Sequence, residues 1–434
     1  MPGLLVLALL LAKPVFAHPA QSSTLSIDLL SDHAAFELHL PVDQLFIAAP
    51  EIFPKAHAAQ NLDEALTIFS QFDSAAAADY LRQHIRLASV VGRDHASDEL
   101  AWPMTVAGLQ VAEHNGELQL VAQLNFENPA FANSSVGNLV LDYDVIAHRV
   151  INHITYASLR RDFALGVTPE STKLLPTLQH HNTHIEIDRT QASTLLGVYT
   201  VFVQGVHHIL AGADHLLFLF CLLLTTPMVI KRGRWQSGPK RFTAIRQALL
   251  LVSAFTLGHT LTLIVAGLGW LTLPSAPVEV AIALTIALAA INLLKPVLKK
   301  YLYCCAGVFG LIHGLAFANS LSLLGLNLST KLLTLMAFTA GIELVQAAIV
   351  MAVLPCLIVL GSRHFRCYRQ FAAVTGGLAL VAAVSWGLQR LQLPSFNSSG
   401  IIDAVAQQSP FLVVALWVLT LATVIGRRKV CASQ

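Results

Sequence analysis

The chain has 434 residues, of which 55% are hydrophobic and only 12% are charged, whereas soluble domains carry about 25% charged residues. This composition excludes an ordinary soluble protein and indicates a polytopic α-helical membrane protein with additional soluble mass. The formal net charge of +2 decides little, because the positions of the charges carry more information than their sum.

Residues 1–17 have the pattern of a secretory signal peptide. An apolar stretch, Leu4–Ala12, precedes the small-x-small sequence that ends at Ala17, which is typical of a cleavage site. The expected positive charge is missing before this stretch, and Lys13 follows it instead. An uncleaved anchor is the alternative, although so short an apolar stretch does not span a bilayer. Cleavage after Ala17 gives a mature chain that starts at His18.

Residues 18–195 form a predicted exported domain. Alternating apolar and polar residues predict strands over 24–30, 35–40, 116–124 and 139–145. Asp73 and Ser74 begin a predicted helix that runs to residue 88. We therefore expect a single mostly-β (α+β) domain of sandwich-like type. Residues 18–200 contain no cysteine, which excludes a disulfide framework.

Histidines are concentrated in this domain, which holds 12 of the 18 in the chain. His180, His181, His184 and Glu186 lie just before the first apolar segment and could pass a metal inward. Ordinary surface histidines are the alternative. Recognition of a periplasmic partner protein is an equal alternative role for the domain.

From about residue 196 to 430 the chain is strongly apolar and predicts a transmembrane domain of about seven helices. The apolar segments cover residues 197–224, 247–270, 277–294, 302–324, 332–360, 371–390 and 410–426. Each is close to or above the roughly 20 residues that a bilayer requires. The lipid bilayer is thus an expected partner, and we expect no nucleic-acid partner.

The charges between these segments predict the orientation. Fifteen Lys and Arg residues lie in alternate connections and the tail. They are Lys231, Arg232, Arg234, Lys240, Arg241, Arg246, Lys295, Lys299, Lys300, Arg363, Arg366, Arg369, Arg427, Arg428 and Lys429. The other connections hold only Lys331 and Arg390. By the positive-inside rule, the C-terminus is predicted to be cytoplasmic and the N-terminal domain periplasmic, in a bacterial inner (plasma) membrane.

Five ionisable residues lie near the middle of apolar segments: Asp214, His215, His259, His313 and Glu343. A charged side chain at this depth costs on the order of 2.5–3.5 kcal/mol on insertion scales. Imidazoles and carboxylates are also ligands that Ni²⁺, Co²⁺ or Zn²⁺ accept. These residues therefore predict a metal site near the middle of the membrane.

Two further residues extend this prediction toward the outer side. His208 precedes His215 by seven residues, which places both on one face of a single predicted helix. Glu279 lies near the outer end of the third segment. Together His208 and Glu279 suggest an entry route for metal from the periplasmic side; a Glu279 side chain that snorkels to the membrane surface is an equal alternative.

Glycines accompany the histidines. Gly205 and Gly212 lie on the first segment, and Gly310 and Gly314 flank His313. Small residues let helices approach closely in a membrane. The structural alternative is that the histidines are polar packing residues satisfied by neighbouring helices.

These residues resemble the hydrogenase/urease accessory permease family HupE/UreJ, in the subgroup with an exported N-terminal domain. The resemblance rests on residues 205–215, 255–259, 278–279, 310–314 and 341–346, and on Asn292. It implies uptake of nickel, or of cobalt in some members. The family's histidine and aspartate motif corresponds here to His208, Asp214 and His215.

The sequence thus predicts a permease for a divalent transition metal, nickel or cobalt foremost, held by His208, Asp214, His215, His259, His313, Glu343 and Glu279. An intramembrane zinc-dependent hydrolase, with Glu343 as base, is the main alternative. A haem-binding electron carrier is a weaker alternative, because carboxylates lie near the histidines. No Walker-A sequence is present, so an internal ATPase is not expected.

Overall fold

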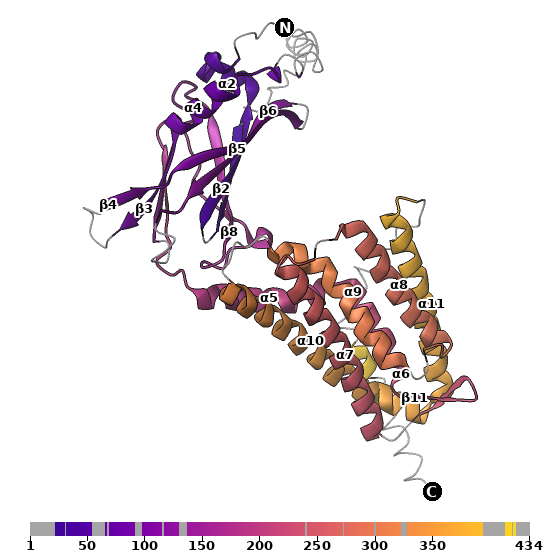
Figure 1. The fold of residues 1–434 in the computed structure, drawn as a ribbon. Coiled ribbons are helices and arrows are strands. Elements are labelled where there is room, and N and C mark those ends of the chain that lie inside the picture. The colour runs from indigo at the N-terminus through magenta and orange to yellow at the C-terminus, as the bar shows by residue number, and fades with distance from the viewer. Residues whose placement is uncertain are drawn as a thin grey trace, which may run out of the picture. The chain divides into compact units, whose positions relative to one another are not determined.

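In the computed structural model the chain forms two compact units, Met1–Leu196 and Gly197–Gln434 (Figure 1). The structure describes residues 22–30, 32–53, 66, 69–91, 98–114, 117–129, 137–238, 241–271, 273–298, 301–322, 328–393, 413–418 and 420–421. The predicted signal peptide, His18, and most of the predicted seventh segment lie outside these residues.

The N-terminal unit contains two β-sheets. The larger has the strand order β5-β6-β2-β1-β8-β9, and the smaller has the order β10-β7-β3-β4. The larger consists of β5 (Met104–His114), β6 (Glu117–Glu127), β2 (His33–Pro41), β1 (Ser22–Leu29), β8 (Ile154–Asp162) and β9 (Lys173–Leu174). The smaller consists of β10 (His184–Ile187), β7 (Leu139–Tyr143), β3 (Ile85–Val91) and β4 (Asp98–Ala101). The four strands expected from the alternating sequence are confirmed as β1, β2, β6 and β7.

Both sheets contribute side chains to one hydrophobic core. Leu25, Leu38 and Leu124 of the larger sheet and Leu87 and Leu141 of the smaller are fully buried in the same cluster. Burying such a side chain contributes about 1.5–3 kcal/mol. A shared core between two sheets is the arrangement of a β-sandwich. The helices α2 (Val42–Ala48) and α4 (Ser74–His84) and the short 3₁₀ turns η1 (Pro50–Ile52) and η2 (Pro169–Ser171) complete the described elements.

Helix α4 begins as the sequence predicts but ends earlier. The Asp73 side chain accepts hydrogen bonds from the backbone N–H groups of Ala75 and Ala76, at 2.9 and 3.0 Å, which caps the helix. The predicted extension to residue 88 is wrong, because strand β3 starts at Ile85 and pairs with β7. Pairing in the smaller sheet overrides the local helical pattern there.

A buried histidine, His153, joins β1 to α2. Its Nδ1 donates to the Gln44 side chain, and its Nε2 accepts a hydrogen bond from the Ser23 hydroxyl at 2.8 Å. The side chain is 1% exposed. Burial lowers the pKa of His153 to about 4, so this imidazole is neutral in the folded protein at neutral pH.

The C-terminal unit is helical. Its elements are α5 (Thr194–Ala211), α6 (Ala213–Thr225), β11 (Met228–Lys231), β12 (Arg234–Ser237), α7 (Arg241–Gly267), α8 (Ser275–Leu294), α9 (Leu302–Ser322), α10 (Leu328–Arg363) and α11 (Phe365–Arg390). Within the described residues, five helices are long and apolar enough to cross a membrane: α5, α7, α8, α10 and α11. Two shorter apolar stretches, Ala213–Thr225 and Leu302–Leu315, accompany them. The expected seven spans are therefore not confirmed, whereas the membrane character is.

The first predicted span is broken into two helices. Gly212 has an extended backbone conformation with φ −76° and ψ 91°, so α5 ends at Ala211 and α6 begins at Ala213. The prediction that His208 and His215 share one continuous helix face is thus wrong. Gly212 permits the break, because a Cβ there would lie 2.8 Å from Nδ1 of His215.

Helices α7 and α9 approach each other closely through glycines. A Cβ on Gly310 would overlap the carbonyl oxygen of Phe255, and one on Gly314 would overlap that of His259. The predicted close approach at these two glycines is confirmed. This contact places the backbones that carry His259 and His313 directly against each other.

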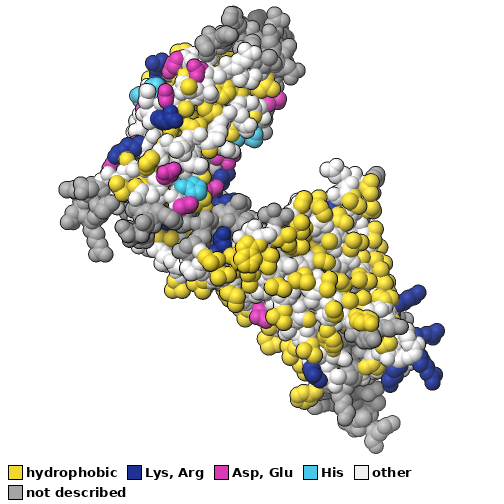
Figure 2. All heavy atoms as spheres, viewed as in Figure 1, with side chains coloured by type: hydrophobic (Ala, Val, Ile, Leu, Met, Phe, Trp, Pro, Cys, Tyr) yellow, Lys and Arg dark blue, Asp and Glu magenta, His cyan; other side chains and the backbone are white. Residues whose placement is uncertain are grey.

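The surface of the helical unit separates apolar from basic side chains (Figure 2). Hydrophobic side chains cover most of the face in view, and Lys and Arg gather at the end where Figure 1 places β11. The β11–β12 hairpin turns at Arg232 and Gly233, both with positive φ. Such an apolar face with basic residues at one end suits a bilayer-embedded unit.

Candidate metal centre

Four histidines and one aspartate from four helices meet inside the helical unit. His208 lies on α5, Asp214 and His215 on α6, His259 on α7 and His313 on α9. His215, His259 and His313 are 6%, 0% and 1% exposed. Polar side chains in a membrane protein characteristically face the protein interior and find partners there.

The distances divide these residues into two overlapping groups. One ligand atom from each of His208, His215 and His259 lies within 4.8 Å of the others, and the same holds for Asp214, His215 and His313. The ring centroids of His208 and His215 are 4.8 Å apart, and those of His215 and His313 are 5.1 Å apart. His215 belongs to both groups and is the centre of the arrangement.

Asp214 orients His215. The carboxylate oxygen Oδ1 of Asp214 lies 2.9 Å from Nδ1 of His215. A carboxylate accepts this hydrogen bond, so the proton lies on Nδ1 and the lone pair on Nε2. A carboxylate behind an imidazole is the usual partner of a metal-binding histidine. The Nε2 atom of His215 is buried and has no hydrogen-bond partner among the described residues.

Thr285 of α8 orients His313 in the same way. The Thr285 hydroxyl donates its one proton to the carbonyl oxygen of Ile282 at 2.7 Å. Its oxygen therefore accepts from Nε2 of His313, which lies 2.9 Å away. This leaves the lone pair of His313 on Nδ1, an atom that is also buried without a partner in the described part of the chain.

His259 is the most unusual of the set. It is fully buried, and neither of its ring nitrogens has a hydrogen-bond partner within the described residues. A buried polar group without a partner costs about 1–3 kcal/mol on the protein mutational scale. A ligand at this position, such as a metal ion, would remove that cost.

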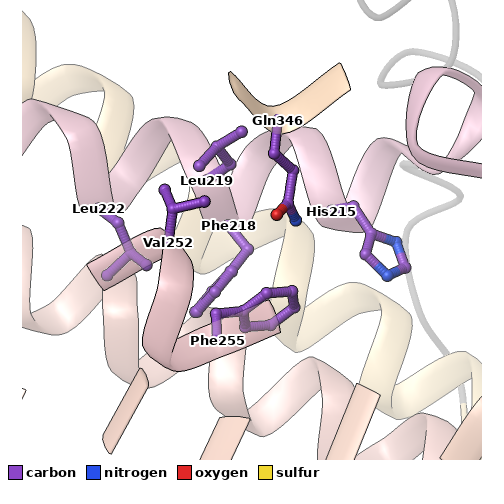
Figure 3. Close-up of a pocket in the computed structure, with 7 residues that line it drawn as sticks. All are labelled: His215, Phe218, Leu219, Leu222, Val252, Phe255 and Gln346. Carbon is purple, nitrogen blue, oxygen red and sulfur yellow. The ribbon is translucent and has the colours of Figure 1, made fainter. Parts of the chain in front are cut away.

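A small pocket lies beside His215 (Figure 3). It is lined by His215, Phe218, Leu219, Leu222, Val252, Phe255 and Gln346. Figure 3 shows the amide of Gln346 pointing into this space, and the Thr256 hydroxyl lies 2.9 Å from its Oε1. The pocket volume of about 10 Å³ is close to the minimum that holds one water molecule.

The two predicted glutamates do not join the cluster. Glu343 lies on α10 with an exposed side chain, although it is near the middle of its helix. Glu279 of α8 forms an ion pair with Arg390 of α11, which provides a nearer partner for its charge. Asn292 serves structure, since its Oδ1 accepts a hydrogen bond from the backbone of Leu298 at 3.0 Å.

The sequence does not reveal Thr285 as part of the site. A single threonine in an apolar helix carries no pattern, and its contact with His313 depends on how α8 packs against α9. Gln346 stands in the sequence three residues after Glu343, and of these two it is the buried one. At a spacing of three residues both lie near the same side of α10, so the sequence does not tell which of the two faces inward.

Residues 183–390 match the model of a protein family described as HupE / UreJ protein. The resemblance expected from the sequence is therefore confirmed over this part of the chain, which includes every residue of the cluster. The family is associated with accessory or transport functions for nickel and cobalt. A comparison with curated proteins finds no match.

Proposed function

We propose, from the HupE / UreJ match and the histidine cluster, that this chain is a membrane permease for a divalent transition metal, with nickel as the first candidate and cobalt the second. The transported ion is bound inside the helical unit by His208, His215, His259 and His313. Asp214 supplies the negative charge of the site.

One observation supports this proposal most strongly. The imidazoles of His215 and His313 are each fixed by a hydrogen bond on one nitrogen, which leaves a lone pair on the other. Those other nitrogens, and both nitrogens of His259, are buried without hydrogen-bond partners among the described residues. Packing histidines would use these atoms, whereas a transient site for a metal keeps them available.

The residues have separate roles in this proposal. His208 precedes the break at Gly212 and receives the ion first. His215, His259 and His313 then replace its water ligands, and Asp214 offsets part of its double positive charge. Because a metal competes with protons for imidazole nitrogens, binding weakens at low pH, which offers a route for release.

The hydrolase alternative has little support in this geometry. It requires a carboxylate base beside the metal, and Glu343, the residue expected in that role, has an exposed side chain. Asp214 is already engaged with His215 at 2.9 Å. A permease needs no general base, so the exposed position of Glu343 does not count against it.

The test is uptake of ⁶³Ni²⁺ in cells that express the native chain or the variants His215→Ala and His313→Ala at matched membrane levels. We expect each variant to lose at least 90% of the uptake above background, since each removes an imidazole nitrogen that a hydrogen bond to Asp214 or Thr285 holds in place. Competition with unlabelled Co²⁺ and Zn²⁺ then ranks the ions.

Two control variants make the test specific. His207→Ala removes an exposed histidine next to His208, and Glu343→Gln removes the exposed glutamate of α10. Both should retain uptake. Equal uptake by the native chain and His215→Ala would overturn the proposed site, and strong zinc binding without uptake by the native chain would overturn transport.

A further inference from the structure

A second histidine cluster lies in the N-terminal unit, where α4 ends. It consists of His84, Asp144 and His148. Strands β3 and β7 are antiparallel with Ile85 opposite Tyr143, and this register brings the preceding residue, His84, beside Asp144. The backbone N–H of Asp144 donates to the carbonyl of His84 at 3.2 Å, and that of His148 donates to the carbonyl of Asp144 at 3.1 Å. The sheet therefore fixes residues that are far apart in sequence.

The three side chains converge. Nδ1 of His84 lies 2.7 Å from Oδ1 of Asp144, and the imidazoles of His84 and His148 stack with centroids 4.2 Å apart at 19°. One ligand atom from each residue lies within 4.8 Å of the others. The His84 and Asp144 side chains are 19% and 40% exposed, so an ion from solution can reach them.

The surrounding backbone holds this arrangement at a cost. Ile146, between Asp144 and His148, has φ 66°, a region that strongly disfavours β-branched residues. Its N–H donates to the hydroxyl of Tyr80 at 3.2 Å. The Tyr80 ring lies 4.4 Å from that of His84 and 6.0 Å from that of His148. The strained turn and Tyr80 together keep His148 against His84.

We propose that His84, His148 and Asp144 form a binding site for a divalent transition metal in the N-terminal unit. Two imidazoles and one carboxylate are a donor set that zinc, nickel and cobalt accept. Three protein ligands leave positions for water, so the ion exchanges with solution. This site does not depend on the permease proposal, because none of its residues belongs to the helical unit.

Other histidines of the unit do not form such a site among the described residues. Nδ1 of His180 lies 2.9 Å from the carbonyl oxygen of Ala147, and Nδ1 of His184 lies 2.9 Å from Oδ1 of Asp142. Neither belongs to a described group of three metal ligands. In the sequence, His180, His181 and His184 with Glu186 could pass a metal inward or be ordinary surface histidines, whereas the geometry favours His84 and His148 as metal ligands.

The test uses the full-length chain in detergent, carrying His215→Ala and His313→Ala to disable the intramembrane site. Co²⁺ and ⁶³Ni²⁺ binding are measured by visible absorption and equilibrium dialysis. We expect about one ion per chain, and at least tenfold weaker binding after His84→Ala with His148→Ala. His33→Ala is the matched control, because Nδ1 of His33 also lies 2.8 Å from a carboxylate, that of Asp32.

Two outcomes would overturn the proposal. One is absence of Co²⁺ binding by the chain that carries only His215→Ala and His313→Ala. The other is unchanged affinity in the His84 and His148 double variant. The substitutions His84→Gln and His148→Gln, which retain polarity, replace the alanines if circular dichroism shows loss of strand signal. Because the readout is binding without transport, failure of this site is distinct from failure of the permease.

Discussion

At the scale of single residues, the proposed intramembrane metal site relies on hydrogen bonds that fix where the imidazoles of His215 and His313 carry their protons. Asp214 does this for His215, and Thr285 does it for His313. Partners of this kind typically contribute 10–100-fold to metal affinity. We therefore expect the metal affinity of the proposed site to depend also on residues that do not contact the ion.

Replacing Thr285 with valine keeps the shape of the side chain and removes its hydroxyl. We expect roughly tenfold weaker nickel binding, because the His313 ring loses the acceptor that holds its proton on Nε2. Equilibrium dialysis of the purified chain measures the effect. Thr334→Val is the control, since among the described residues the Thr334 hydroxyl donates to the carbonyl of Thr330 in its own helix. Equal affinities of the two variants would contradict this role of Thr285.

His153 predicts a pH dependence in the N-terminal unit. Its pKa is about 4 when folded and about 6.5 when unfolded, so between these values the unfolded chain binds more protons. Stability therefore falls as the pH drops from about 6.5 to 4, by about 3 kcal/mol in total. Hydrogen exchange of β1 and β8, followed by mass spectrometry, should show this loss. His153→Gln should flatten it, and an equally steep response would refute the assignment.

At the scale of elements, glycine contacts determine how closely α7 and α9 pack. Gly310→Ala introduces a Cβ that overlaps the carbonyl of Phe255, and such overpacking costs about 1–3 kcal/mol. We expect a lower melting temperature for the purified chain and weaker metal binding, because the backbones of His259 and His313 move apart.

The matched control lies on α11. A Cβ on Gly377 meets no atom within 4 Å, so Gly377→Ala should be neutral or stabilise its helix by about 0.5–1 kcal/mol. Melting temperatures that shift equally in both variants would show that helix propensity, and not the α7–α9 contact, controls the effect.

The sequence predicts which helices and strands this chain forms better than it predicts where helices break or end. Apolar length and alternation reveal the helices and the strands β1, β2, β6 and β7. They do not reveal the break at Gly212, because the residues on both sides remain apolar and only the packing of His215 and Asp214 favours an extended glycine. The end of α4 at His84 is not evident from the sequence for a similar reason, since the pairing of Ile85 with β7 joins residues far apart in the chain.

The same limit applies to the candidate site. Histidines in apolar helices are conspicuous because charge and polarity are costly there, and all four meet in the structure. The position of Glu343 near the centre of its apolar segment puts it at the same membrane depth as the histidines. That position carries no information about which face of α10 turns inward. The structure settles this through Gln346, which is buried where Glu343 is exposed.

At the scale of the whole molecule, the distribution of basic residues predicts that the N-terminal unit and the β11–β12 hairpin lie on opposite sides of the membrane. In a chain whose six cysteines are replaced by alanine, Leu174→Cys tests the N-terminal unit and Gln236→Cys tests the β11–β12 hairpin. Both positions are exposed. A membrane-impermeant maleimide should label Leu174→Cys in intact spheroplasts and label Gln236→Cys only after permeabilisation.

Two results would count against this orientation. Labelling of Gln236→Cys in intact spheroplasts would place the hairpin outside. Protection of Leu174→Cys until permeabilisation would place the N-terminal unit in the cytoplasm. Leakage is monitored with a cytoplasmic enzyme, so that breakage of the spheroplasts is not mistaken for exposure.

The parallel pairing of β1 with β8 imposes an order of events on folding. Strand β1 begins at Ser22, yet one of its two neighbours in the sheet is completed only at Asp162. Closing so long a loop is slow compared with forming a hairpin. During synthesis, one edge of β1 therefore stays without its partner strand until most of the N-terminal unit has been made. That partner, β8, ends only about thirty residues before the helical unit begins. A chaperone that shields strand edges would act in this interval.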